Sequence, residues 1–268
     1  MGEVNMKHII QNECKRALCG RGMAVSLVIS FSVIAWHIYD RVFGPEAVSS
    51  VNIFTRETLF QIWIGGNVTY MQTYLYFKII PLLCVLPAGA TLFEDYKGGY
   101  TNFVFVRTTR LKFLAAKYIA VFLSGGFAVT VPLAVNFLCT ALRFPALKPE
   151  PIMMAGPNLN AMWLDLYYGN PWLFTMLSFF IIFLLSGAVA TLALLFTYLT
   201  DYKFLVLLLP FVCCSILEVI ENISNIPIAL SSFLIPVFPE RYGFMLWIYF
   251  LFFAVVGIVY YILGCCKE

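Results

Sequence analysis

Six long, mainly apolar stretches with few or no charged residues constrain the fold of this chain more than any other feature. A helix needs about 20 apolar residues to cross the hydrocarbon core of a bilayer, so each stretch is a candidate membrane span. We expect these spans at residues 22–39, 73–93, 118–142, 172–200, 204–221 and 244–264.

The composition agrees with a chain that lies mostly in lipid. Hydrophobic residues make up 62% of it and charged residues 12%, whereas soluble domains carry about 25% charged residues. The net charge of +3 is small and the bases do not line one face, which excludes a nucleic-acid-binding protein. Because a backbone in lipid must satisfy its own hydrogen bonds, each span is predicted to be a helix. The sequence therefore predicts an all-α polytopic membrane protein, with residues 1–268 forming one transmembrane domain.

The distribution of Lys and Arg predicts the orientation of the chain. Six spans place both termini on the same side of the membrane, and eleven of the 17 Lys and Arg residues fall on that side. Cytoplasmic loops carry an excess of these bases. We therefore expect both termini and the segment 94–117 to be cytoplasmic.

Residues 1–21 are predicted to form an amphipathic helix at the inner membrane surface. Within VNMKHIIQNECKRALCGR, the apolar Val4, Ile9 or Ile10 and Leu18 recur at helical spacing among basic and polar residues. The stretch is too polar for a cleaved signal peptide. A frayed basic tail is the alternative interpretation.

Residues 222–242 lie between the last two predicted spans. The segment is apolar, but Pro227, Pro236 and Pro239 interrupt it, so it is too broken for a span and too apolar for a free loop. These properties predict a re-entrant or interfacial element on the outer side.

The segment 94–117 is the only substantial cytoplasmic loop, and it concentrates basic residues. Its bases are Lys97, Arg107, Arg110, Lys112 and Lys117. Its interleaved apolar residues are Phe103, Phe105, Leu111, Phe113 and Leu114. This order of residues predicts a short amphipathic helix that docks on lipid or on a protein. Ordinary positive-inside anchoring is the alternative explanation of the charge.

The stretch EDYKGGYTNFVFVRTTRLKFLAAK resembles the cytoplasmic loop between the second and third helices of type-2 ABC transporter permeases, the membrane subunits of one class of ATP-driven exporters. Glu94, Gly98, Arg110 and Lys117 stand at the positions of the family's acidic, glycine, basic and lysine residues. The chain departs from the pattern at residues 99–101, where Gly-Tyr-Thr replaces a simple glycine-threonine continuation. It departs again at Arg107, where many members have proline.

The resemblance implies a coupling helix that sits in a cleft of a separate ABC ATPase subunit. It implies that Glu94 and Gly98 set the bend between helix and loop, and that Arg110 and Lys117 pair with acidic groups of the ATPase or with lipid phosphate. The implied coupling residues are Glu94, Gly98, Arg107, Arg110, Lys112 and Lys117. It further implies a pair of short outer helices in the segment 222–242 and a second permease copy or paralogue as a partner.

The chain carries no G-x-x-x-x-G-K-[S/T] phosphate loop, so ATP and Mg are expected on the partner ATPase, with no cofactor on this chain. An intramembrane enzyme is the rival from another class. It would need an H-E-x-x-H metal motif or a nucleophile elbow, and the sequence contains neither. We therefore expect a subunit without an enzyme activity of its own.

Three ionisable residues fall at similar depth in the outer halves of the predicted spans: Lys78, Glu218 and Glu221. Such groups are costly if they face lipid, which suggests a pairing of Lys78 with Glu218 or an outer gate. Snorkelling of each group to the outer headgroups is the alternative. The small residues of Gly125–Gly126 and of the SGAVA run at 186–190 are expected to let helices pack closely.

The most favoured function is therefore the permease subunit of an ABC exporter in the plasma membrane of a bacterium. The apolar, Phe-rich spans favour an amphipathic or apolar cargo, such as an antimicrobial or signalling peptide. A non-transporting sensor or immunity subunit that anchors an ATPase is the alternative, and it would look almost the same in sequence.

Overall fold

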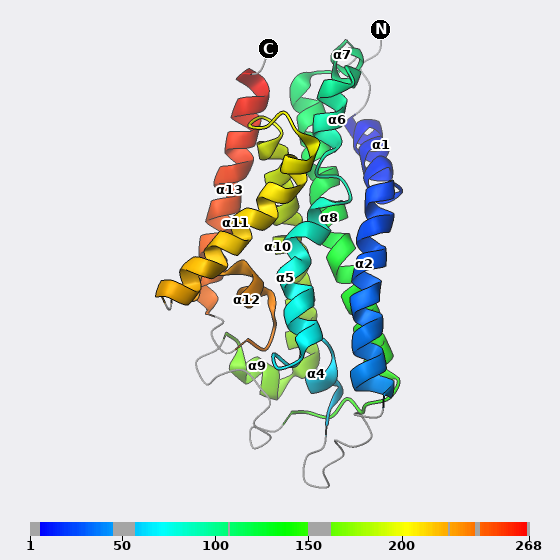
Figure 1. The fold of residues 1–268 in the computed structure, drawn as a ribbon, viewed down its shortest axis with the longest axis vertical. Helices are drawn as coiled ribbons and strands as arrows, with labels where there is room; N and C mark the ends of the chain where they lie inside the picture. Colours follow the sequence, from blue (N-terminus) through cyan, green and yellow to red (C-terminus); the bar gives the residue numbers. More distant parts are fainter. Residues whose placement is uncertain are drawn as a thin grey trace.

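A computed structural model describes residues 6–44, 57–106, 108–149, 162–224, 226–238 and 242–266, and all regular elements in them are helices. Five segments are long and apolar enough to cross a membrane, and they run along the bundle in Figure 1. They are α2 (Arg21–His37) with its π-helical continuation η1 (Ile38–Phe43), α8 (Arg110–Ala141), α10 (Pro171–Phe196), α11 (Lys203–Ser224) and α13 (Gly243–Cys266).

The predicted span 73–93 is not one continuous helix. It divides into α5 (Met71–Val85) and α6 (Thr91–Lys97), which follow one another along the bundle axis (Figure 1). Pro87 has no backbone N–H to continue the hydrogen-bond ladder, and the chain turns there. At about 1.5 Å per residue α5 is roughly 22 Å long, short of the roughly 30 Å hydrocarbon core.

The segment 94–117 contains three helical pieces instead of one amphipathic helix. It takes in the end of α6, the short α7 (Tyr100–Phe105) and the first two turns of α8. Gly99 joins α6 to α7 with a φ of 69°, a left-handed conformation that glycine adopts without steric cost. The loop is therefore a compact corner built onto the long helix α8.

The predicted N-terminal helix is present as α1 (Met6–Leu18), but it presents a different face from the one expected. Ile9, Glu13 and Ala17 are buried, four residues apart, and pack toward α8, whereas Leu18 is exposed. The start of α1 and the end of α13 lie at the end of the bundle that also carries α6 and α7 (Figure 1).

The centre of the bundle is the contact between α8 and α10, which depends on small residues. A Cβ on Gly125 would lie 2.4 Å from the Cβ of Ala190, and one on Gly187 would lie 2.7 Å from the carbonyl oxygen of Phe122. No side chain fits at such distances, so these glycines let the two helices approach. The close packing predicted for them is confirmed.

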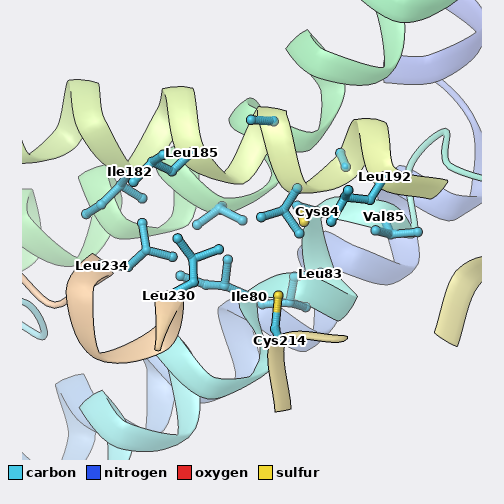
Figure 2. Close-up of a cluster of buried hydrophobic side chains, with 14 of the residues drawn as sticks. Ile80, Leu83, Cys84, Val85, Ile182, Leu185, Leu192, Cys214, Leu230 and Leu234 are labelled. Carbon is cyan, nitrogen blue, oxygen red and sulfur yellow. The ribbon is translucent and has the colours of Figure 1, made fainter. Parts of the chain in front are cut away.

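The opposite end of the bundle is closed by short helices, α4 (Leu59–Ile62), α9 (Leu164–Gly169) and α12 (Leu230–Leu234). Leu230 and Leu234 of α12 point into an apolar cluster formed with α5 and α10, where they approach Ile80, Ile182 and Leu185 (Figure 2). Within the described part of 222–242, the structure contains one short helix instead of the implied pair, and this helix is tucked into the bundle.

Candidate functional site

A buried network of charges lies beneath the corner formed by α6 and α7. At its centre is Lys117 of α8, whose side chain is only 1% exposed. Its Nζ lies 2.6 Å from Oε2 of Glu13 in α1 and 2.5 Å from Oδ2 of Asp95 in α6. Glu13 and Asp95 are themselves 4% and 3% exposed. Three helices thus contribute one charge each to a site shielded from solvent.

Arg16, one turn after Glu13 on α1, completes the network. Its Nη2 donates to Oδ1 of Asp95 at 2.9 Å, and its Nη1 donates to Oε1 of Glu13 at 3.2 Å. Burial opposes the charge of this guanidinium, but the hydrogen bond and charge of Asp95 and the charge of Glu13 outweigh it, so the pKa of Arg16 is raised. Two acids and two bases therefore balance one another.

The network fastens α1 and α6 to α8. Removing charges from water is costly, and the cost is recovered only where each carboxylate and ammonium finds good partners. Each carboxylate here contacts both cations, so every member depends on the others. The arrangement contains no nucleophile paired with a base, and its chemistry is that of a clamp.

Above the clamp, the surface of α7 is apolar and exposed. Phe103 is 76% exposed and Val106, directly after α7, is 77% exposed. Beside them a cavity of about 440 Å³ opens between α1 and α7, with Ile9 and Phe113 among its walls. The Arg16 guanidinium lies 5.1 Å from the ring centroid of Tyr100, the first residue of α7, and so links the clamp to this surface.

Lys117, which the resemblance implied to be a coupling residue, is buried. We expected it to pair with an ATPase or with lipid phosphate, but its ammonium is enclosed by acids of its own chain. Glu94 is half-exposed and forms an ion pair with Lys203, at the start of α11. Gly98 caps α6, as the expected bend between helix and loop requires, and its N–H donates to the carbonyl of Glu94.

Two of the other residues expected to couple to an ATPase, Arg110 and Lys112, lie in the first turn of α8. Arg110 donates to the backbone carbonyl of Cys265 at 3.3 Å and stacks over the ring of Phe105. Lys112 is partly exposed. Arg107 lies outside the described residues. The segment therefore contacts both α6 and the end of α13 through different side chains.

Sequence reasoning missed Glu13, Arg16 and Asp95 as functional residues. One signal was present: Glu13 is the only acid in α1, and it lies on the same helical stripe as Ile9 and Ala17. An acid on an apolar stripe requires a cation opposite it. Its partner could not be identified, because Lys117 is 104 residues away.

At the opposite half of the bundle, Lys78 and Glu218, whose pairing the sequence left as one of its hypotheses, form an ion pair. Nζ of Lys78 lies 3.3 Å from Oε1 of Glu218, and the hydroxyl of Tyr74 bridges the two. These side chains remain 37% and 18% exposed. The pair joins α5 to α11.

Glu221 does not join that pair. Its carboxylate accepts hydrogen bonds from the N–H of Ala229 and the hydroxyl of Ser232, at the start of α12. It therefore fastens α12 to the end of α11, one helical turn beyond Glu218.

The described part of the chain contains no group of three or more His, Cys, Asp and Glu side chains that could hold a metal ion. The clamp and the α7 surface form the best-defined site among the described residues. Comparisons of the chain with protein-family models, curated proteins and solved structures give no match.

Proposed function

We propose that this chain is the membrane-spanning permease subunit of an ABC exporter, and that it couples to a separate ATPase subunit through α7. The observation that carries the proposal is the clamp formed by Glu13, Asp95 and Lys117 directly beneath an exposed apolar corner. A docking surface can transmit force only if it is rigidly connected to the helices that must move.

The contacts suggest a route for that movement. Force applied to α7 passes through the clamp to α1 and α8, and through the Glu94–Lys203 ion pair to α11. Pro87 separates α5 from α6, so the corner can tilt without bending α5. In this mechanism the clamp residues act on the coupling surface from inside, while Phe103 and Val106 contact the ATPase.

The same proposal gives roles to the membrane-spanning helices and to the outer ion pair. The exposed apolar faces of α11 and α13 suit lipid or a second permease copy or paralogue, which supplies the other half of the pathway. An amphipathic or apolar cargo, such as a peptide, fits these spans, and the Lys78–Glu218 pair serves as its outer gate. We place the complex in the plasma membrane of a bacterial cell.

The test is co-expression of this chain, tagged alone, with the ATPases encoded beside its gene. We expect a phosphate-loop ATPase to co-purify in mild detergent and to hydrolyse ATP. Phe103→Glu should abolish both, because it places a charge in the apolar docking surface. Leu142→Glu is the matched control, since Leu142 is also exposed but lies after the other end of α8.

Failure of any ATPase to bind the unaltered chain would refute the proposal. If the ATPase still binds the Phe103→Glu variant, α7 is not the docking surface. An ATPase that binds at α7 but moves no cargo when reconstituted in liposomes would favour the sensor or immunity subunit.

A further inference from the structure

A second cleft lies at the same end of the bundle, away from α7. It has a volume of about 540 Å³ and opens where the α1–α2 junction, the turn between α5 and α6, and the start of α11 meet. Its lining combines charged and apolar residues. The charged residues are Arg16, Arg21, Glu94 and Lys203.

The cations of this cleft differ in whether they are already neutralised. Arg16 is held by Glu13 and Asp95 in the clamp, and Lys203 is paired with Glu94. The guanidinium of Arg21 forms no ion pair or hydrogen bond with any of the residues that the structure describes. The cleft therefore offers one uncompensated guanidinium beside a second, half-exposed cation.

The position of the cleft matches a lipid–water boundary. Arg21 is the first residue of α2 and Lys203 the first of α11, and apolar segments follow both of them. Val25 and Leu207, one turn further along these helices, form the apolar side of the cleft. The charged rim thus lies where headgroups are expected, and the apolar wall lies where acyl chains begin.

Tight backbone packing fixes the floor of the cleft. A Cβ on Gly22 would lie 2.2 Å from the carbonyl oxygen of Leu86, so the start of α2 approaches the α5–α6 turn closely. The first-turn N–H groups of α2, of which those of Met23 and Ala24 donate to the carbonyl of Gly20, carry a partial positive charge. They add to the attraction of Arg21 for an anion.

We propose that this cleft binds the phosphate headgroup of an anionic membrane lipid. Arg21 contacts the phosphate, Lys203 lies at the rim, and one acyl chain runs along Val25 and Leu207. The guanidinium forms two parallel hydrogen bonds with phosphate oxygens, which an ammonium cannot do. The site does not depend on the proposed transport function.

The experiment uses the full chain purified in detergent. Native mass spectrometry measures how much dioleoyl phosphatidylglycerol and dioleoyl phosphatidylcholine it retains. We expect the unaltered chain to prefer phosphatidylglycerol and Arg21→Gln to lose that preference by about tenfold, the size of a charged hydrogen bond. Arg21→Lys should recover part of it. Lys15→Gln is the matched control, an exposed cation on α1 that does not line the cleft.

Two further measurements make the result decisive. Thermal unfolding of Arg21→Gln should match that of the unaltered chain, which shows that lost binding is not lost structure. Excess inorganic phosphate should fail to displace the lipid, because the acyl chain contributes to binding. Equal retention of phosphatidylglycerol by the unaltered chain and Arg21→Gln would overturn the proposal, and so would full displacement by phosphate.

Discussion

Two of the charge sites among the described residues, the clamp and the outer pair, are built on different principles. The clamp joins Lys117 to Glu13 and Asp95 with side chains no more than 4% exposed. The outer pair joins Lys78 to Glu218 with side chains 37% and 18% exposed. Both connect helices that are far apart in sequence, yet only the clamp holds three charged side chains that are almost fully buried.

This difference determines how each site responds to the loss of a partner. A buried charge left without its counter-ion keeps its full desolvation cost, whereas a half-exposed one is solvated or reaches the headgroups. The clamp should therefore act as an obligatory fastening between α1, α6 and α8. The outer pair can open and re-form at little cost, as a gate requires.

The largest effect is expected for Lys117→Met. The half-exposed Arg16 then remains as the cation beside two buried carboxylates, and we expect a loss of about 3–5 kcal/mol in the free energy of unfolding. Titration with sodium dodecyl sulfate, followed by helical circular dichroism, measures the loss. Lys15→Met, which removes an exposed base from α1, should have little effect. A change of similar size in both variants would contradict the role of the clamp.

A smaller effect is expected for Glu13→Gln. The amide keeps the shape of the side chain but loses its charge, while Asp95 still neutralises Lys117. We expect a loss of about 1.5–3 kcal/mol, the range for a hydrogen bond to a charged group. Hydrogen exchange should quicken in α1 and remain unchanged in the centre of α10. Unaltered exchange in α1 would show that apolar packing alone holds this helix.

Substitutions in the outer pair should lower the free energy of unfolding less than substitutions in the clamp. We expect Lys78→Met to cost at most about 1 kcal/mol, as for partly exposed ion pairs. Lys78→Glu should cost more, because it places two carboxylates together, and adding Glu218→Lys should recover the loss. Thermal unfolding of the single and double variants in detergent measures this cycle. Lack of recovery in the double variant would mean that the pair contributes nothing to joining α5 and α11.

The smallest effect is expected at a fully solvated pair on the same end as the clamp. Lys97 lies 3.1 Å from Asp201, with side chains 58% and 86% exposed. Lys97→Gln should change the free energy of unfolding by less than about 0.5 kcal/mol, because water already screens this contact. A loss comparable to that of Lys117→Met would show that burial does not separate the two classes of pair.

The pattern of apolar runs in the sequence predicted most of the long helices, but it predicted few of the segments that join them. The long apolar runs became α2, α8, α10, α11 and α13 with boundaries close to those expected, except that α8 begins at Arg110. The span 73–93 was wrong as a single helix, since Pro87 ends α5. Pro81 lies inside α5 and Pro210 inside α11 without ending either helix, so a proline in the sequence does not by itself predict a helix end.

The sequence could suggest a pair of charged residues only where the depth of both residues in the membrane could be estimated. Lys78 and Glu218 fall at similar depth when residues are counted from the ends of their spans, which suggested their contact beside the alternative that each group snorkels to the headgroups. Lys117 was counted as a surface base because it borders an apolar run, and its acidic partners lie in separate segments. Counting residues along a span does not show which side of the helix packs against its neighbours.

The sequence by itself determined that this is an all-helical chain with several segments able to cross a membrane, because uncharged runs of this length must satisfy their backbones internally. The tertiary structure decided which charges are surface groups and which form the core of a clamp. That choice depends on desolvation, and desolvation of Lys117 arises only when α1 and α6 pack around α8 and bring Glu13 and Asp95 to it.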